Sequence, residues 1–132
     1  MSSFATSLTD KLFIDDPKLD LDDKRIVMRV DYNVPLAEDG SSVADNQRIV
    51  ASLPTINFLL QKNVKSIVLL SHLGRPDGHV VPKMSLAPVA KELQKLLNPQ
   101  NVQFVSGSCV SEEAIKSCSE PKKGKFTSTD LV

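Results

Sequence analysis

The chain has 132 residues, of which 41% are hydrophobic, and its 16 basic residues balance its 16 acidic ones. This length and apolar content fit one domain with one hydrophobic core. The zero net charge excludes a strong general attraction to nucleic acid or to an acidic membrane, so we expect neither as a partner. Any binding site for an anion must therefore be a local cluster of cations.

The sequence contains no recognisable secretory signal. Its first residues, MSSFATSLTDKLFIDD, lack a basic start and an apolar stretch, and no apolar run approaches the ~18–20 residues of a membrane span. The cysteines, Cys109 and Cys118, have no histidine nearby and do not resemble a zinc-binding set, and no carboxylates cluster as they would around Mg²⁺. We expect a cytoplasmic protein with reduced cysteines and no metal site of its own.

The first part of the chain predicts a surface arm followed by a strand. Residues 1–23 mix isolated apolar positions with acids and Pro17, which is typical of an arm that packs only in places. The run KRIVMRVD (24–31) concentrates apolar residues and indicates a strand buried on both faces, although so short a run does not by itself exclude a helix.

A helix is predicted over QRIVASLPTINFLLQKN (47–63), with Asp45 or Asn46 as its N-cap. Pro54 lies inside this span and predicts a bend or a second start, because proline lacks an N–H and crowds the preceding turn. The apolar residues that fall on one face at helical spacing are Ile49, Leu53, Ile56 and Leu60.

The next elements follow the same alternation. VKSIVLL (64–70) is rich in β-branched residues and predicts the second strand, VQFV (102–105) predicts the third, and SEEAIKSC (111–118) predicts a short helix capped by Ser111. Ser85 can cap the helix between these strands. The apolar stripe of that helix consists of Leu86, Val89, Ala90, Leu93, Leu96 and Leu97.

The order strand–helix, repeated three times, predicts an α/β fold with a Rossmann-like open parallel sheet and right-handed crossovers. The tail, PKKGKFTSTDLV (121–132), is basic and polar where another apolar strand is expected. We therefore predict an incomplete sheet with an uncovered edge, which favours association between molecules.

Ligands of open parallel sheets gather outside the carboxyl ends of the strands. The residues that the first two strands bring to this edge are Asp31, Asn33, Arg48, Ser71, His72, Gly74 and Arg75. Arginine suits phosphate or carboxylate because its planar fork gives paired, charge-assisted hydrogen bonds, whereas Asp31 suits a substrate hydroxyl. Singly, each residue fits an ordinary structural role, but together they predict a site for a small hydroxylated molecule carrying phosphate, carboxylate or both.

Nucleotide-binding motifs are not found in the sequence. No G-x-G-x-x-G follows the first strand. The tail segment GKFTST differs from a phosphate-binding loop at two positions, where Ser119 replaces the upstream glycine and Phe126 replaces the Ser or Thr after the lysine. We expect no nucleotide cofactor bound by this chain.

Four segments together resemble the N-terminal domain of phosphoglycerate kinase. They are RVDYNVP (29–35), DNQRIVASLPTI (45–56), SIVLLSHLGRPDG (66–78) and SLAPVAKELQKLL (85–97). The resemblance implies a glycolytic transferase that moves a phosphoryl group between 1,3-bisphosphoglycerate and Mg-ADP, giving 3-phosphoglycerate and Mg-ATP. In that family the N-terminal domain binds the glycerate and the C-terminal domain binds the nucleotide.

The resemblance also implies roles for individual residues. Asp31 and Asn33 would contact the glycerate, His72 and Arg75 would hold its 3-phosphate, and Arg48 would be the catalytic residue that stabilises the transferring phosphoryl group. The residues that would support them are Val30, Tyr32, Gln47, Ser71 and Gly74. Tyr32 stands where the family usually has phenylalanine.

The resemblance ends near residue 118, and the divergent tail (119–132) replaces the family's next strand and its LENLR-like segment. The family, usually monomeric, uses Mg-ATP and Mg-ADP, but its nucleotide-binding domain has no counterpart in this sequence. Residues 1–132 are therefore predicted to form a partial 3-phosphoglycerate-binding domain without turnover alone. The alternative is a non-catalytic fragment that acts as an interaction or regulatory module. An enzyme with other chemistry is disfavoured, since no nucleophile–base pair or metal set is found.

Overall fold

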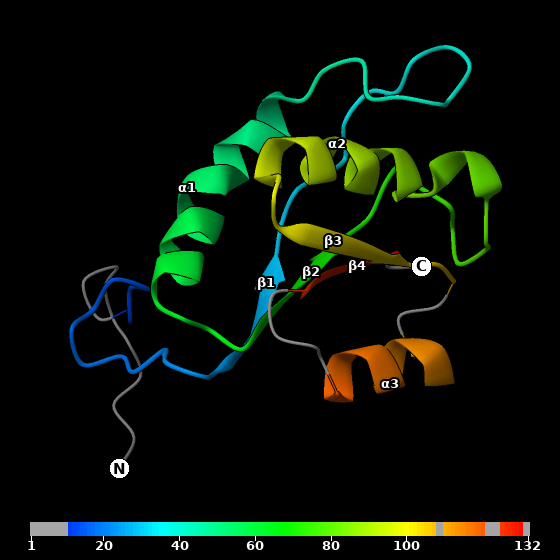
Figure 1. The fold of residues 1–132 in the computed structure, drawn as a ribbon. Helices are drawn as coiled ribbons and strands as arrows, with labels where there is room; N and C mark the ends of the chain where they lie inside the picture. The colour runs from blue at the N-terminus through cyan, green and yellow to red at the C-terminus, as the bar shows by residue number, and fades with distance from the viewer. Residues whose placement is uncertain (1–10, 108–109, 121–124, 131–132) are drawn as a thin grey trace.

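The computed structural model describes residues 11–107, 110–120 and 125–130 of the chain. Strands and helices alternate along it (Figure 1). The elements are β1 (Arg25–Arg29), α1 (Gln47–Gln61), β2 (Ser66–Ser71), a 3-10 turn (Pro82–Met84), α2 (Ala87–Leu97), β3 (Asn101–Val105), α3 (Glu112–Ser119) and β4 (Lys125–Asp130).

The strands form a parallel four-stranded sheet in the order β1-β2-β4-β3, which confirms the predicted α/β class. The chain moves in one direction across the sheet from β1 to β2 to β3 and then steps back to β4. Right-handed crossovers therefore place α1 and α2 on one face and α3 on the other, as Figure 1 shows.

The prediction that the tail lacks a strand was wrong. Lys125–Asp130 forms β4, which lies between β2 and β3 and pairs with both, with Thr127 in register with Val68 and Gln103. Threonine and phenylalanine favour strands, and the place between two other strands offers hydrogen bonds on both sides. This tertiary environment outweighs the polar composition on which the sequence prediction relied.

The prediction that the first strand is buried on both faces was also wrong. Along β1, exposed and half-buried residues alternate, and Val27 is 67% exposed while Ile26 and Met28 pack against the core. The strand lies at one end of the sheet, and α3 packs against β3 and β4 instead of β1. The face of β1 that carries Val27 is therefore exposed in the part of the chain that the structure describes.

The core lies between the sheet and the helices α1 and α2. Its fully enclosed side chains include Ile49, Ile56 and Leu59 of α1 and Leu93 of α2. The predicted stripe of α2 is confirmed except at Leu96, which is only half-buried. In α1, Leu59 was missed and the predicted Leu53 and Leu60 are only half-buried. Helix α1 continues through Pro54 without a second start.

The helix caps agree with the sequence in part. Ser111 caps α3, since its Oγ accepts the Ala114 N–H at 3.2 Å. Asn46 is the N-cap of α1, but its side-chain amide donates to Glu92 of α2 at 3.0 Å and makes no bond to its own helix. The N-cap position of α2 is Leu86, one residue after the predicted Ser85, but Oγ of Ser85 accepts the N–H of Ala87, the first residue of the helix, at 3.2 Å.

The segment before β1 matches the predicted arm where the structure describes it. Residues 11–20 are mostly exposed, and Leu21 is buried against the core, whereas residues 1–10 lie outside the described residues. Cys118 is a half-buried free thiol whose pKa is raised by burial, and Cys109 lies outside the described residues. Within the described part of the chain, no helix has the length and apolar character needed to cross a membrane.

Candidate functional site

A cavity of about 490 Å³ opens at the carboxyl ends of β1 and β2. Asp31, Asn33, Arg48 and His72, which the sequence singled out, line it together with Val30, which was predicted to support them. The remaining lining residue is Arg29. The structure therefore brings the two loops together at the edge where parallel sheets bind their ligands.

Arg48 is oriented by the loop that follows β1. Its Nη1 donates to both carboxylate oxygens of Asp31, at 2.9 and 3.0 Å, and to the backbone carbonyl of Asn33 at 2.9 Å. The side chains remain 53% exposed for Arg48 and 66% exposed for Asp31. Because these bonds to described residues all use Nη1, the other N–H groups of the guanidinium remain donors for an anion.

Backbone and side-chain bonds join the loop after β1 to the loop after β2. The Gly74 N–H donates to Asn33 Oδ1 at 2.9 Å, and the Tyr32 N–H donates to Ser71 Oγ at 2.9 Å. The Asn33 N–H in turn donates to Asp31 Oδ1 at 3.2 Å. The two loops consequently hold one another in position around the cavity.

Gly74 has a structural reason to be glycine. Its φ is +70°, a left-handed conformation that side chains disfavour, and an added Cβ would lie 2.8 Å from Sδ of Met84. The sequence had grouped Gly74 with the residues that support the site. The structure adds the tight turn and the close contact with Met84, which fix the path of the loop that carries His72.

Tyr32 links the first loop to the helix that carries Arg48. Its side chain is fully buried, and its hydroxyl lies 2.7 Å from Oγ of Ser52. The Ser52 hydroxyl donates to the Ile49 carbonyl at 2.7 Å, so Tyr32 must be the donor in the first bond. Burial raises the pKa of Tyr32, and the bond to Ser52 lowers it by less.

Arg75 and Gln47 were also predicted but do not line this cavity. Arg75 is exposed, and Gln47 lines a neighbouring hollow of about 290 Å³ together with Asn33 and Arg48. Arg29 lines the main cavity but was missed. It precedes Asp31 by two positions, and residues two apart in a strand point to the same side, so the alternation could have indicated it.

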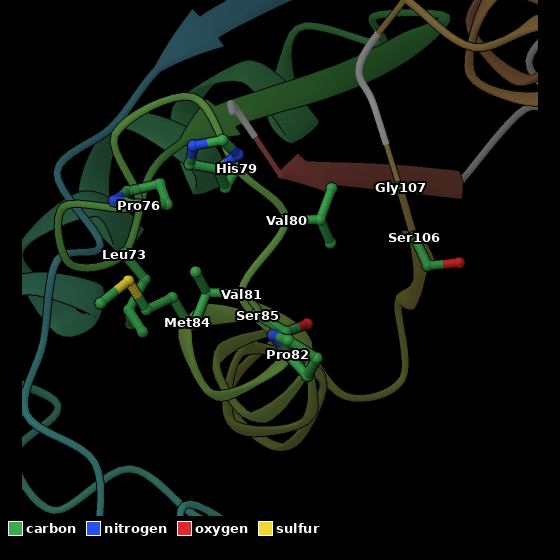
Figure 2. Close-up of a pocket in the computed structure, with 10 residues that line it drawn as sticks. All are labelled: Leu73, Pro76, His79, Val80, Val81, Pro82, Met84, Ser85, Ser106 and Gly107. Atoms are coloured by element: carbon green, nitrogen blue, oxygen red, sulfur yellow. The ribbon is translucent and has the colours of Figure 1, made fainter.

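A second cavity, of about 290 Å³, lies between the segment that follows β2 and the residues that follow β3 (Figure 2). Most of its lining is apolar, and His79 and Ser85 are among its polar members. The lining residues are Leu73, Pro76, His79, Val80, Val81, Pro82, Met84, Ser85, Ser106 and Gly107. This composition does not suit a phosphate. Among the described residues, no group of His, Cys, Asp and Glu is placed to hold a metal ion.

A family model described as phosphoglycerate kinase matches residues 14–129 of the chain. The chain belongs to the phosphoglycerate kinase family. The phosphoglycerate kinase of Funneliformis mosseae is 55% identical over 106 residues and that of Saccharomyces cerevisiae is 54% identical over 107 residues. These matches cover 80% and 81% of this chain but only 24% of each relative. The chain thus spans about a quarter of the length of the curated phosphoglycerate kinases that it matches.

Solved phosphoglycerate kinase structures share the fold. The enzyme of Coxiella burnetii aligns with a TM-score of 0.65 and 30% sequence identity, over 86% of this chain and 26% of its own. The enzyme of Pyrococcus horikoshii aligns with a TM-score of 0.70 and 25% identity, over 85% and 26%. The resemblance seen in the sequence is therefore confirmed at the level of family and fold.

Proposed function

We propose that this chain binds the glycerate substrate of the phosphoglycerate kinase reaction, 3-phosphoglycerate or 1,3-bisphosphoglycerate, in the cavity at the ends of β1 and β2. The observation that carries the proposal is the hydrogen bonding of the Arg48 guanidinium. Asp31 and Asn33 hold one nitrogen of its guanidinium, its other N–H groups make no hydrogen bond within the described part of the chain, and it lines one cavity with Arg29 and His72. A preoriented arginine binds a phosphate or carboxylate with little ordering cost.

The charges around the cavity favour an anion. Arg29 and Arg48 contribute two positive charges, against one negative charge from Asp31. The carboxylate of Asp31 lowers the positive potential in the cavity, but it orients Arg48. A carboxylate also has enough lone pairs to accept a hydrogen bond from a substrate hydroxyl. This combination suits a ligand that carries both an anionic group and a hydroxyl, as glycerate phosphates do.

The roles follow from these positions. Arg48 would contact the carboxyl end of the glycerate and stabilise charge on the transferring phosphoryl oxygens, which is the main contribution a protein makes to such a transfer. Asp31 and Asn33 would bind the hydroxyl region, and His72 would bind the 3-phosphate. Arg75 would join His72 from the exposed part of the same loop.

Turnover requires a nucleotide site as well. We propose that Mg-ADP and Mg-ATP bind in the part of the family's length that this chain does not span, and that these 132 residues alone, as a partial N-terminal domain of a cytoplasmic enzyme, bind glycerate without transferring phosphate. Phosphoryl transfer depends on metal, cations and exclusion of water at both substrates at once. An assay of transfer from 1,3-bisphosphoglycerate to Mg-ADP tests this directly, and measurable turnover by the chain alone would contradict it.

Calorimetric titration of the chain with 3-phosphoglycerate tests the site. Each charge-assisted hydrogen bond contributes about 1.5–3 kcal/mol, so we expect the Arg48→Ala, Arg75→Ala double variant to bind at least about tenfold more weakly than the unaltered chain. Arg25→Ala is the matched control. It also removes an arginine, but Arg25 lies at the start of β1 and does not line the cavity. Equal affinity of the double variant and the unaltered chain would overturn the proposal.

The second candidate, an interaction module, is favoured by one specific observation. The edge of β1 that faces away from β2 has no partner among the described residues.

A further inference from the structure

The bonds to Arg48 described above fix its guanidinium but not the helix from which the side chain extends. Nη1 donates to the carboxylate of Asp31 and to the backbone carbonyl of Asn33. Arg48 is the second residue of α1, so the position of its backbone depends on how the first turn of that helix is held. A long side chain with many rotamers keeps one position at low cost only if both its ends are held.

Tyr32, the residue between Asp31 and Asn33, contacts this first turn. Its hydroxyl donates to Oγ of Ser52 at 2.7 Å, and the Ser52 hydroxyl donates to the Ile49 carbonyl at 2.7 Å. Ile49 follows Arg48 directly in the chain, and Ser52 lies one turn further along α1. Two successive hydrogen bonds therefore link the loop after β1 to the helix backbone beside Arg48.

The surroundings of Tyr32 fix the position of its hydroxyl. The side chain is fully buried within the hydrophobic core, and the backbone N–H donates to Oγ of Ser71, which is itself buried, at 2.9 Å. A buried hydroxyl requires a hydrogen-bond partner, and Ser52 supplies it. Because the ring and the backbone of Tyr32 are both held, the hydroxyl is a fixed point to which α1 is attached.

We propose that Tyr32 is a positioning residue for the cavity at the ends of β1 and β2, and that its hydrogen bond to Ser52 holds the first turn of α1 where Arg48 can bind an anion. The inference rests on the proposed function, because the anion is the glycerate substrate. Asp31 and Asn33 hold the guanidinium of Arg48 while Tyr32 holds its backbone. Without the hydroxyl the turn can shift, and a small displacement of a binding group weakens binding.

Variants that lack one hydroxyl test the proposal by calorimetric titration with 3-phosphoglycerate. Tyr32→Phe and Ser52→Ala each remove the bond between the two residues, and we expect each to weaken binding about three- to tenfold. Ser52→Thr keeps a hydroxyl at the same position and should bind within about twofold of the unaltered chain. A loss of affinity that is the same in Ser52→Thr and Ser52→Ala would contradict the role of the hydroxyl.

Ile56→Val is the matched control for a general loss of stability. It removes one buried methylene group from α1 and no hydrogen bond, and urea unfolding shows whether its stability falls as far as that of Tyr32→Phe. We expect Ile56→Val to keep the affinity for 3-phosphoglycerate, because Arg48 stays in place. If Tyr32→Phe weakens binding no more than Ile56→Val does, Tyr32 stabilises the fold only and the inference is wrong.

NMR of the arginine side chains separates this inference from the proposed function, because it needs no ligand. In the isotope-labelled chain, the guanidinium signal of Arg48, assigned with Arg48→Lys, should be sharp and well resolved because Nη1 is held. Tyr32→Phe should broaden or shift this signal, and Ile56→Val should leave it unchanged. If the unaltered chain binds no 3-phosphoglycerate, the proposed function fails and the Arg48 signal alone decides the role of Tyr32. The same signal in Tyr32→Phe and in the unaltered chain would overturn the inference.

Discussion

The phenol of Tyr32 sits between the loop that holds Asp31 and the helix that carries Arg48, and it is the only tyrosine in the chain. Its burial raises its pKa in the folded state above the usual value of roughly 10. The unfolded chain therefore loses this proton first as the pH rises. The stability that depends on the neutral phenol is complete below roughly pH 10 and is lost as the pH rises through the folded-state pKa.

We expect the free energy of unfolding to fall more steeply above roughly pH 10 in the unaltered chain than in Tyr32→Phe. Urea unfolding followed by circular dichroism over a series of pH values measures the difference, and the lysines, which ionise in both proteins, cancel. Because the chain has no tryptophan, the absorbance of the phenolate reports this one group directly. The same pH dependence in both proteins would show that the buried hydroxyl does not affect stability.

Single residues of the site were predictable where a simple rule of geometry applied. Asp31, Asn33 and His72 follow strands, and the rule that parallel strands end at one edge was enough to group them. The bond from Gly74 to Asn33 was not predictable, because it depends on how two irregular loops pack against each other. Arg29 was missed because only residues after the end of the strand were considered. Side chains two residues apart in a strand point to the same side, so Arg29 could have been grouped with Asp31.

At the scale of elements, Gln94 connects α2 to the outer edge of β3. Its Nε2 donates to the Gln100 carbonyl at 2.6 Å, and its Oε1 accepts the Val102 N–H at 2.7 Å. One side chain thus satisfies backbone groups at the start of β3, which has no neighbouring strand on that side among the described residues. The amide takes the place of a strand neighbour there, which limits pairing with other chains.

Replacing Gln94 by alanine should lower the free energy of unfolding by about 1–3 kcal/mol, because two half-buried backbone groups lose their partner. Hydrogen exchange of the Val102 amide should become faster in the same variant. Lys91→Ala is the matched control, since Lys91 lies one turn earlier in α2 with an exposed side chain. Unchanged exchange at Val102 would contradict the assigned role of Gln94.

The elements themselves were predicted with uneven success, and the reason is physical. Helix α2 has apolar residues at helical spacing, and strand β2 is rich in β-branched residues. Each could therefore be predicted from its own sequence. The exposure of β1 and the presence of β4 depend on neighbours. An apolar run such as RIVMR does not encode whether a second helix covers it, and KFTSTD becomes a strand because two others flank it.

For the whole molecule, the position of β4 means that the sheet depends on a segment whose polar composition did not predict a strand. Strands β2 and β3 each pair with β4, and the described sheet contains no pairing between them. Helix α2 contacts β3 and helix α1, so β3 also keeps a link to the core through its helix. Removing the ladder of β4 should therefore loosen β3 and α3 before the part built on β1, β2 and α1.

Thr127→Pro tests this dependence, because Thr127 lies in the middle of β4 and each N–H of a central strand bonds to one neighbour or the other. The lost bond leaves a backbone group unsatisfied at a cost of about 1–3 kcal/mol, a large part of the ~5–15 kcal/mol that stabilises a small domain. We expect urea unfolding to shift to lower concentration, with faster hydrogen exchange in β3 than in β2. Thr127→Ala keeps the N–H and should shift much less. If the two variants unfold alike, β4 is not needed to hold β3 in the sheet, and the sheet is held together by the helices alone.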